Sequence, residues 1–474
     1  MASNDGLFKI IIGLIFKLIN LIVRALLWPL YGSSGEKVPP IDNLLLLDSA
    51  TTLAHKIRTK KVTSYEVVQS FINRIKEVNP ILNCVIDERF DDALREAKEV
   101  DKFIASGTKT KEELLKDTPF LGVPFTTKDC IGVKGLSCTI GLYSRKGVKA
   151  DEDADPIALM RKAGAIPIGI TNVSELCIWW ESNNAVYGRT NNVYNTNHIV
   201  GGSSGGEGCL QSCAGSAMGI GSDIGGSVRI PAFFNGIFGH KPSTGIGSLK
   251  GHFPPLSSPD QNSYLVVGPM SRYATDLLPM FKVIAANHVN ELKLNESVDI
   301  TKLKYYYMDD DTGGFLISPV DKEIKQAIQK IISYYKKTHG ITIEKVNLTK
   351  LRYSMALWFA KMKVSDEAQM PSELANRQGE VDIIKELLKF PFMVSHHTLP
   401  VLCTAVLEKL NVEYNSPKHR YLLDMCAQLK MEFQVWEKNC FCLWSGDIFP
   451  SWHKSHPLAK ISPFFELLPN FFYF

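Results

Sequence analysis

The sequence predicts an α/β fold in which a largely parallel or mixed β-sheet is covered by helices on both faces. Along most of the chain, apolar runs typical of buried strands alternate with amphipathic segments of helical spacing. Of the 474 residues 45% are hydrophobic, which is enough for a large core. The ten cysteines are too sparse for a disulfide scaffold, and a net charge of +4 does not indicate nucleic-acid binding.

The N-terminus predicts attachment to a membrane. Residues 7–31, LFKIIIGLIFKLINLIVRALLWPLY, are far more apolar than any later stretch. Lys17 and Arg24 interrupt this stretch, and a central charge costs about 2.5–3.5 kcal/mol in a spanning helix. Gly13, Lys17, Asn20 and Arg24 recur at helical spacing, which favours a helix lying in the interface. We therefore expect residues 1–35 to be a hydrophobic anchor helix; a single span and a signal peptide stay open.

Residues 40–474 are expected to form one domain. Thr63 and Glu66 are placed as a capping box, with Asn79-Pro80 as the stop of that first helix. We expect the stretch 287–301 to be a flexible excursion. Helices are predicted over 63–76, 91–103, 154–163 and from 318 to a stop at Gly340, and strands over 166–170, 302–308 and 341–346.

Glycine is concentrated in one region. Residues 201–247 contain 14 of the 34 glycines. Such a segment is costly in chain entropy, so it indicates close backbone approach to a ligand and N–H groups aimed at it. A phosphate loop is not favoured, because the GK[ST] sequence is absent. Ser203 in GGSSG formally matches a nucleophile elbow, which would need a downstream acid and one of the histidines His396, His397, His453 or His456.

Three segments together carry a more specific pattern. They are GVPFTTKD at 122–129, GGSSGGEG at 201–208, and SDIGGSVRIPA at 222–232, followed by GHKP at 239–242. The set resembles the amidase signature family of serine hydrolases, in particular its type 2 fatty-acid amide hydrolase branch. The resemblance is strong from about residue 47 to 250 and weaker to about 450. It implies the amidase-signature fold, with a large mixed sheet.

The resemblance also implies a Ser–Ser–Lys triad. It places the nucleophile at Ser227, the bridging serine at Ser203 after a cis peptide bond, and the base at Lys128. A serine hydroxyl is a poor nucleophile until a base removes its proton. Lysine is such a base only when neutral, against an ordinary pKa of about 10.4, and burial favours the neutral form.

The glycine loop before the nucleophile predicts an oxyanion hole. The main-chain N–H groups of Ile224, Gly225, Gly226 and Ser227 are the expected donors, because glycine permits the tight curvature that brings consecutive N–H groups together. These donors would stabilise the charge that develops on the amide oxygen in the transition state.

Five further residues are candidates for a role beside the triad. One of them has a single expected role, and each of the other four has two possible interpretations. Asp223 is expected to accept N–H bonds from the loop, and Arg229 either holds the loop or forms a surface ion pair. Ser204 either orients the triad or caps the next helix. Trp179 and Trp180 either line an acyl channel or pack in the core.

No metal and no cofactor are predicted. Cys440 and Cys442, with His453 and His456, have ligand-like spacing but lack a tight knuckle. The adjacent pair at 396–397 is expected on opposite faces of a strand, in a structural role.

We expect a membrane-associated serine amidohydrolase that cleaves fatty-acid primary amides or N-acylethanolamines. Its expected partners are a lipid amide, a membrane and a second copy of the chain, but not nucleic acid. The expected location is the endoplasmic reticulum or lipid-droplet surface, on either side of the membrane. A broader amidase or esterase, and an inactive lipid-binding form, stay open. The family continues beyond the point that corresponds to Ser451, so we expect the C-terminal part of the domain to be incomplete.

Overall fold

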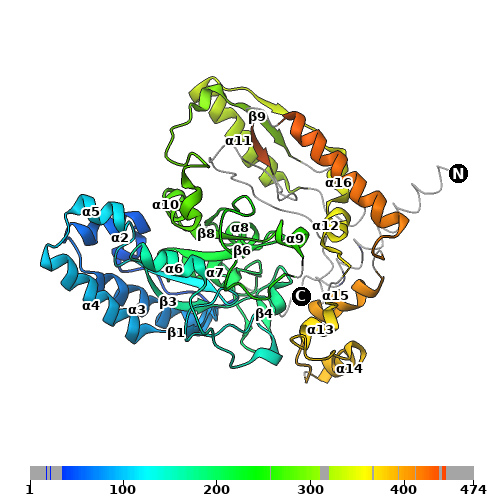
Figure 1. The fold of residues 1–474 in the computed structure, drawn as a ribbon, viewed down its shortest axis with the longest axis horizontal. Coiled ribbons are helices and arrows are strands. Elements are labelled where there is room, and N and C mark those ends of the chain that lie inside the picture. The colour runs from blue at the N-terminus through cyan, green and yellow to red at the C-terminus, as the bar shows by residue number, and fades with distance from the viewer. Residues whose placement is uncertain are drawn as a thin grey trace.

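The computed structural model describes residues 18, 22, 35–256, 258–309, 320–365, 368–392, 394–410, 413–436 and 440–444. Figure 1 shows an elongated body with the first helices at one end and α13 to α15 at the other. The α-helices of the described residues are α2 (Ala50–Arg58), α3 (Ser64–Leu82), α4 (Phe90–Ser106), α5 (Lys111–Asp117), α6 (Asp155–Lys162), α7 (Gly205–Ser212), α8 (Arg229–Phe234), α9 (Pro259–Asn262), α10 (Ala274–Ala285), α11 (Lys322–His339), α12 (Ser354–Met362), α13 (Met370–Leu374), α14 (Ile383–Lys389), α15 (Leu399–Leu410) and α16 (Pro417–Trp436).

Short 3₁₀ helices connect several of these elements. They are η1 (Leu44–Leu47), η2 (Tyr143–Arg145), η3 (Glu175–Cys177), η4 (Ala286–Val289), η5 (Ile300–Lys302), η6 (Thr349–Tyr353) and η7 (Phe390–Phe392).

The main sheet has six strands in the order β1-β3-β2-β6-β8-β7. Its centre is parallel, because β2 pairs in parallel with both β3 and β6, whereas β1 and β8 flank this centre in antiparallel pairing. The predicted mixed sheet is therefore confirmed. The strands are β1 (Val85–Glu88), β2 (Pro124–Lys128), β3 (Ile166–Thr171), β6 (Gly219–Asp223), β7 (Phe238–Gly239) and β8 (Val266–Ser271).

The middle strands are buried on both faces, as expected for strands covered by helices. Every residue of β2, β3, β6 and β8 is buried. Helices α3, α4, α6, α7 and α10 pack against these strands. The same core contains Phe71, Phe120, Phe125 and Ile168, which are fully buried.

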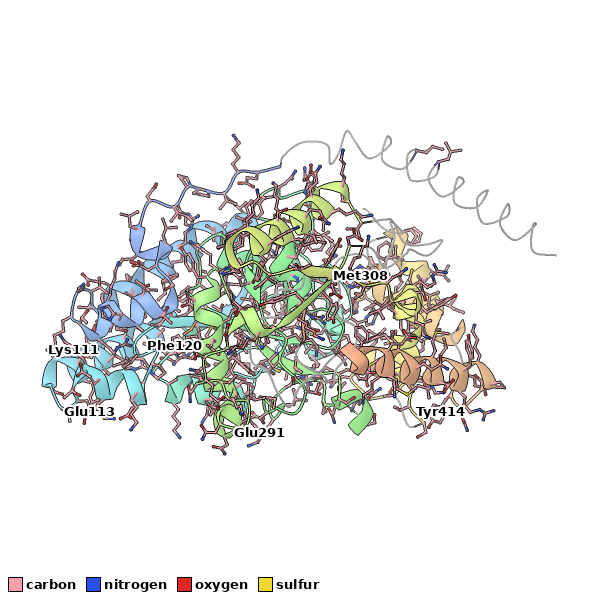
Figure 2. The ribbon with its side chains drawn as sticks, turned by 90° about the horizontal axis from the view of Figure 1, so that it is seen from above. Lys111, Glu113, Phe120, Glu291, Met308 and Tyr414 are labelled. Atoms are coloured by element: carbon pink, nitrogen blue, oxygen red, sulfur yellow. The ribbon has the colours of Figure 1, made fainter. Side chains whose placement is uncertain are left out.

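A second, smaller layer lies beside the main sheet. Its three strands β9 (Lys304–Met308), β10 (Ile343–Lys345) and β11 (Cys440–Trp444) are all parallel, in the order β10-β9-β11. Figure 1 shows α11, α12 and α16 around this sheet. In Figure 2 the label Met308 marks the last residue of β9. Leu357 of α12 and Leu429 of α16 are fully buried in the apolar cluster that packs beside this second sheet. The strands β4 (Asn183–Asn184) and β5 (Gly188–Arg189) pair with each other in a separate antiparallel hairpin.

The first long helix begins as predicted and ends later. The Thr63 hydroxyl accepts from the Glu66 N–H at 3.0 Å, and the Glu66 carboxylate accepts from the Thr63 N–H at 2.8 Å. The predicted stop at Asn79-Pro80 is wrong, because α3 continues to Leu82. Asn83 ends it with a left-handed φ of 49°, and its N–H donates to the main-chain oxygen of Asn79.

Most other predicted elements are confirmed with small shifts at their ends. Helix α11 begins at Lys322 after the cap Asp321 and ends at Gly340, whose φ is 67°. The stretch 287–301 is not a free excursion, because Leu292 and Leu294 are buried in an apolar cluster with α10. These two side chains fix the connection to the body of the protein.

Parts of both ends of the chain lie outside the described residues. Of the predicted anchor over 1–35, the structure describes Leu18 and Ile22, which are helical and half or more exposed, and Gly35. The residues after Trp444 are outside the described part as well. Among the described helices, none combines the length and the apolar character needed to cross a membrane.

Candidate active site

The ends of two neighbouring parallel strands bring the predicted residues together. Lys128 is the last residue of β2 and Asp223 is the last residue of β6, which lies beside it. Because carboxyl ends of parallel strands meet at one edge of a sheet, both side chains lie at the same edge. Ser203 precedes α7, and Ser227 lies between β6 and α8.

Lys128 is buried and hydrogen-bonded to two serines. Its Nζ lies 2.7 Å from the Ser203 Oγ, 3.0 Å from the Ser222 Oγ and 3.4 Å from the Ser222 main-chain oxygen. Only 1% of the lysine is exposed. The neighbouring Asp129 carboxylate instead accepts from the Thr139 N–H at 2.8 Å. Burial raises the pKa of Asp129 to about 6, although its hydrogen bonds with Thr139 oppose this shift.

Close contacts explain the glycines that precede the bridging serine. The peptide bond between Gly202 and Ser203 is cis. A Cβ at position 202 would lie 2.4 Å from the main-chain oxygen of Trp179, so no side chain fits there. The predicted cis bond and the tight approach of this loop to its neighbours are both present.

Ser204 does not cap α7 through its side chain. Its Oγ lies 3.5 Å from the Ser222 main-chain oxygen, and its N–H donates to the Ser227 main-chain oxygen at 3.2 Å. The Ser182 Oγ accepts from the Gly205 N–H at 2.9 Å instead. Ser204 thus connects the bridging-serine loop to the nucleophile loop.

Asp223 and Arg229 form a buried pair that shapes the loop between β6 and α8. The Arg229 Nε donates to one carboxylate oxygen of Asp223 and the Nη2 to the other, both at 3.0 Å. The same carboxylate accepts from the N–H groups of Gly226 at 2.8 Å and Val228 at 3.0 Å. Burial acts to raise the pKa of Asp223, but the Arg229 guanidinium outweighs it and holds that pKa well below its usual range. The surface ion pair that the sequence left open is therefore not formed.

The hydrogen bonds change the set of free donors in the predicted oxyanion hole. The Gly226 N–H is already used by Asp223, in contrast to the expectation that it faces the substrate. Ile224 and Ser227 are half-buried and Gly225 is exposed, so this part of the loop reaches the surface of the site. A Cβ at position 225 would lie 3.5 Å from the ring of Trp358.

Sequence reasoning missed Trp358 of α12. Its indole Nε1 donates to the Ile224 main-chain oxygen at 3.2 Å, and its ring covers the loop at Gly225. Nothing in the sequence pattern joins this residue to a loop 134 positions earlier.

Sequence reasoning also missed His252, which is connected to Lys128 through the hydroxyl group of Ser222. Its Nε2 is 3.0 Å from the Ser222 Oγ and 3.4 Å from the Cys130 Sγ. Burial, and after it the charge of Lys128, lowers the pKa of His252 to about 4. The imidazole is therefore neutral at neutral pH.

The two predicted channel tryptophans lie together beside the serine loop. The rings of Trp179 and Trp180 are 4.5 Å apart at an angle of 48°, and both are half-buried. The Trp179 main-chain oxygen accepts from the Ser174 Oγ at 2.8 Å. The pair is thus placed at the site, and its contact with an acyl chain stays a prediction.

Comparison with known proteins decides the family. A family model described as Amidase matches residues 66–438 of the chain. The chain belongs to this amidase family. Fatty-acid amide hydrolase 2 of Homo sapiens is 43% identical over 421 residues, which cover 88% of this chain and 79% of that protein. Fatty-acid amide hydrolase 2-B of Danio rerio is 43% identical over 403 residues, covering 84% and 76%.

Solved structures show the same fold. A structure of fatty acid amide hydrolase matches with a TM-score of 0.64 and 23% identity, covering 86% of this chain and 70% of that one. A crystal structure of an amidase matches with a TM-score of 0.65 and 20% identity, covering 85% and 83%. The amidase is thus a hydrolase that acts on the C–N bonds of amides.

Of the four histidines that the sequence offered as partners of a nucleophile elbow, the structure describes two. His396 and His397 lie in the loop before α15 rather than in a strand. The His397 Nδ1 is 2.7 Å from the buried carboxylate of Glu175, and His396 stacks on Tyr143 at 3.8 Å. His453 and His456 lie outside the described residues. Among the residues that are described, no group of histidine, cysteine and carboxylate side chains could hold a metal ion.

Proposed function

We propose that this amidase hydrolyses fatty-acid amides, either primary amides or N-acylethanolamines, with Ser227 as nucleophile, Ser203 as proton relay and Lys128 as base. The observation that carries the proposal is the buried 2.7 Å hydrogen bond between Lys128 and Ser203, at the edge where the nucleophile loop also lies. The identity of 43% to fatty-acid amide hydrolase 2 supports the substrate class.

In the acylation step, the Ser227 Oγ attacks the amide carbonyl carbon and forms a C–O bond. Its proton passes to the Ser203 Oγ, while the Ser203 proton passes to the Lys128 Nζ. The carbonyl oxygen becomes an oxyanion. When the tetrahedral intermediate collapses, the C–N bond breaks and the amine leaves with a proton returned through the same relay. Water then gives a proton to Lys128 through Ser203 and attacks the acyl carbon. The bond between that carbon and the Ser227 Oγ breaks, the proton returns to the Ser227 Oγ, and the fatty acid leaves.

The oxyanion needs donors that are in position before the reaction. The N–H groups of Ile224, Gly225 and Ser227 are the proposed donors, because Asp223 engages the N–H of Gly226. Asp223 also holds the N–H of Val228, which fixes the curvature of the loop around the proposed oxyanion position.

An exposed apolar patch supports association with a lipid surface. The patch is made by α14, η7 and Val394, with Lys385 and Lys389 on the same helix, where Lys389 pairs with Glu386. Its large apolar side chains, each more than half exposed, are Ile384, Leu388, Phe392 and Val394. Contiguous exposed apolar surface of this kind is rare on proteins that have no partner, and lysines beside it suit anionic headgroups.

A buried contact connects the patch with the wall of the site. His397, just beyond the patch, binds Glu175, which begins η3 and precedes Trp179 by four residues. The second Glu175 oxygen accepts from the Thr398 N–H at 2.7 Å. A substrate that partitions into a membrane would thus meet the protein close to the segment that carries the two tryptophans.

Removal of the nucleophile tests the proposed function. We expect Ser227→Ala to lower kcat on oleamide by at least about 10³-fold, because the acyl-serine can no longer form. A fluorophosphonate probe should label the parent protein at Ser227 and leave the variant unlabelled. Oleamide hydrolysis by the variant at the parental rate would contradict the proposed nucleophile.

The substrate class is tested separately. Rates on oleamide and on a short-chain amide such as butyramide distinguish a fatty-acid amide hydrolase from a broader amidase. We expect kcat/KM to favour oleamide by more than about 100-fold, since each buried methylene contributes about 0.8 kcal/mol. Equal values for both amides would favour the broader amidase, and a folded parent that is not labelled at Ser227 would favour the inactive form.

A further inference from the structure

His252 is not explained by the triad, although it lies one hydrogen bond away from the catalytic lysine. The Ser222 Oγ is 3.0 Å from both the Lys128 Nζ and the His252 Nε2, so it bridges the two. The His252 Nδ1 is buried, and a main-chain hydrogen bond with Pro254 acts to raise the pKa of the imidazole. The side-chain contacts of the ring are with Ser222 and Cys130, on the lysine side.

The hydrogen bonds around Lys128 restrict where each proton lies. A neutral lysine amine has two N–H donors and one lone pair. The Ser222 main-chain oxygen can only accept, so it takes one N–H. The second N–H and the lone pair are then divided between the Ser203 Oγ and the Ser222 Oγ. Lys128 can act as base only if the lone pair faces Ser203, so its second N–H must donate to Ser222.

That arrangement requires an acceptor for the Ser222 hydroxyl proton. Two acceptors are within reach, the His252 Nε2 at 3.0 Å and the Cys130 Sγ at 3.4 Å. A thiol sulfur is a weak acceptor, whereas an unprotonated imidazole nitrogen is a good one. The lowered pKa of His252, about 4, leaves the imidazole neutral across the neutral pH range, with one N–H and one acceptor nitrogen. The Nε2 is the acceptor in the tautomer that carries the proton on Nδ1, and the proposal requires that tautomer. Without this acceptor, the hydroxyl proton can turn to the lone pair of Lys128.

We propose that His252 is a positioning residue which, by accepting the Ser222 hydroxyl proton, keeps the lone pair of Lys128 directed at Ser203. This inference rests on the proposed triad. The role is carried through Ser222, and His252 itself touches neither substrate nor the reacting atoms. The consequence is a specific dependence on one nitrogen, Nε2, rather than on the bulk or charge of the ring.

Two amide variants of different length test that dependence. In His252→Gln the side-chain oxygen can reach the position of Nε2, whereas in His252→Asn it reaches only the position of Nδ1. We expect His252→Gln to keep kcat within about 5-fold of the parent. His252→Asn should lose about 10- to 100-fold, which corresponds to one lost hydrogen bond beside a buried polar group. KM should change by less than about 3-fold in both variants, because the contact acts on the chemical step.

A second pair of variants separates positioning from structural support. His252→Leu leaves the Ser222 hydroxyl free to compete for the lone pair of Lys128, so it should be as slow as His252→Asn. Ser222→Ala removes the competing hydroxyl. The double variant His252→Leu/Ser222→Ala should therefore match Ser222→Ala alone and be faster than His252→Leu, a non-additive result typical of residues that act through one another.

The measurement combines kcat on oleamide with the rate of fluorophosphonate labelling at Ser227. His288→Leu, which changes an exposed histidine paired with Glu291, is the matched control and should equal the parent. Equal loss in His252→Gln and His252→Asn, or additive losses in the double variant, would overturn the proposal. If a leucine variant fails to fold, the Gln and Asn pair still decides.

The two readouts keep this inference distinct from the proposed function. If the parent is labelled at Ser227 but does not hydrolyse oleamide, the substrate class is wrong and the labelling rates still test His252. If the folded parent is not labelled at Ser227, both the triad and the role of His252 are overturned.

Discussion

Trp358 controls the direction of a peptide group in the proposed oxyanion loop. Its indole N–H donates to the Ile224 main-chain oxygen. The carbonyl of Ile224 and the N–H of Gly225 belong to one planar trans peptide group, so they point in opposite directions. Holding that carbonyl towards α12 therefore turns the Gly225 N–H away from α12, where it is free to donate to an oxyanion.

We expect Trp358→Phe to lower kcat about 10-fold with a smaller change in KM, because the ring still packs on Gly225 but the anchoring N–H is lost. Steady-state kinetics on oleamide check this result. Tyr353→Leu, which removes an exposed aromatic side chain at the start of α12, is the control and should equal the parent. If the Phe variant keeps the parental kcat, the indole N–H has no part in fixing the loop.

At the residue scale, the sequence indicates the groups that lie in short glycine-rich motifs. The Lys128 Nζ lies 2.7 Å from the Ser203 Oγ, and Asp223 accepts N–H bonds from the loop that follows it. His252 and Trp358 could not be found in this way, because each reaches the site through a contact made only by the tertiary fold. Neither residue belongs to a motif whose spacing carries a chemical meaning.

At the element scale, Glu207 joins α7 to two strands of the main sheet. Its carboxylate accepts from the hydroxyls of Thr126 in β2 and Thr171 in β3, at 3.0 Å and 2.9 Å, and from the Gln211 side chain at 2.9 Å. Burial raises the pKa of Glu207 to about 7, and the three hydrogen bonds oppose that shift only in part. The folded protein therefore holds this proton more tightly than the unfolded chain does.

The sign of the resulting pH dependence follows from linkage. Below the ordinary pKa of 4.5 Glu207 is protonated in both states, and its contribution to the free energy of unfolding is fully present. As the pH rises from 4.5 through about 7, the unfolded chain loses the proton first, so this contribution falls; above about 7 it stays constant. Neutral Glu207→Gln does not titrate.

We expect Glu207→Gln to have about the same Tm as the parent at pH 5 and a Tm about 2–5 °C higher at pH 8. Thermal unfolding of both proteins at the two pH values checks this. A difference between the proteins that is equal at pH 5 and pH 8 would show that Glu207 does not titrate in this window.

The ends of elements were predicted where a local side chain decides them. The capping box at Thr63 and the stop at Gly340 depend on neighbours in sequence, and both are present. Asn79-Pro80 was misleading because the Asn79 side chain accepts from the N–H groups of Cys84 and Val85, beyond the helix end. These bonds support the chain after the helix and do not interrupt the helix itself.

On the scale of the whole molecule, the exposed apolar patch and the first helices lie at opposite ends. Figure 1 places α14 at one end and α5 at the other, and Figure 2 labels Lys111 and Glu113 at the α5 end. Exposed leucines occur at both ends, with Leu388 in the patch and Leu115 in α5. This arrangement offers a matched comparison.

We expect Leu388→Ser/Phe392→Ser to slow hydrolysis of oleamide held in phosphatidylcholine and phosphatidylserine vesicles by about 10-fold, since two large apolar side chains no longer enter the lipid. Hydrolysis of a soluble short-chain amide should be unchanged. Leu115→Ser should behave as the parent on both substrates. Equal loss in Leu115→Ser, or no loss in the double variant, would contradict a lipid-facing role of the patch.

The mixed main sheet was predicted from the alternation of strands and helices, but the second sheet was predicted only in part. Strands were expected over 302–308 and 341–346, and the structure has β9 at Lys304–Met308 and β10 at Ile343–Lys345. The pairing of β11 with β9 was not predicted, because the spacing of Cys440 and Cys442 resembles that of metal ligands and does not indicate a strand. Pairing between segments about 130 residues apart has no local signature in one sequence.

The buried pair of Asp223 and Arg229 has a consequence for the energy of each turnover. One carboxylate receives a guanidinium and three main-chain N–H groups, so the loop has its curvature before any substrate arrives. The loop is thus preorganised: the free energy needed to align its dipoles is met once, when the chain folds, and not again in every catalytic cycle. A folded-state ion pair that contacts no substrate can in this way lower a reaction barrier.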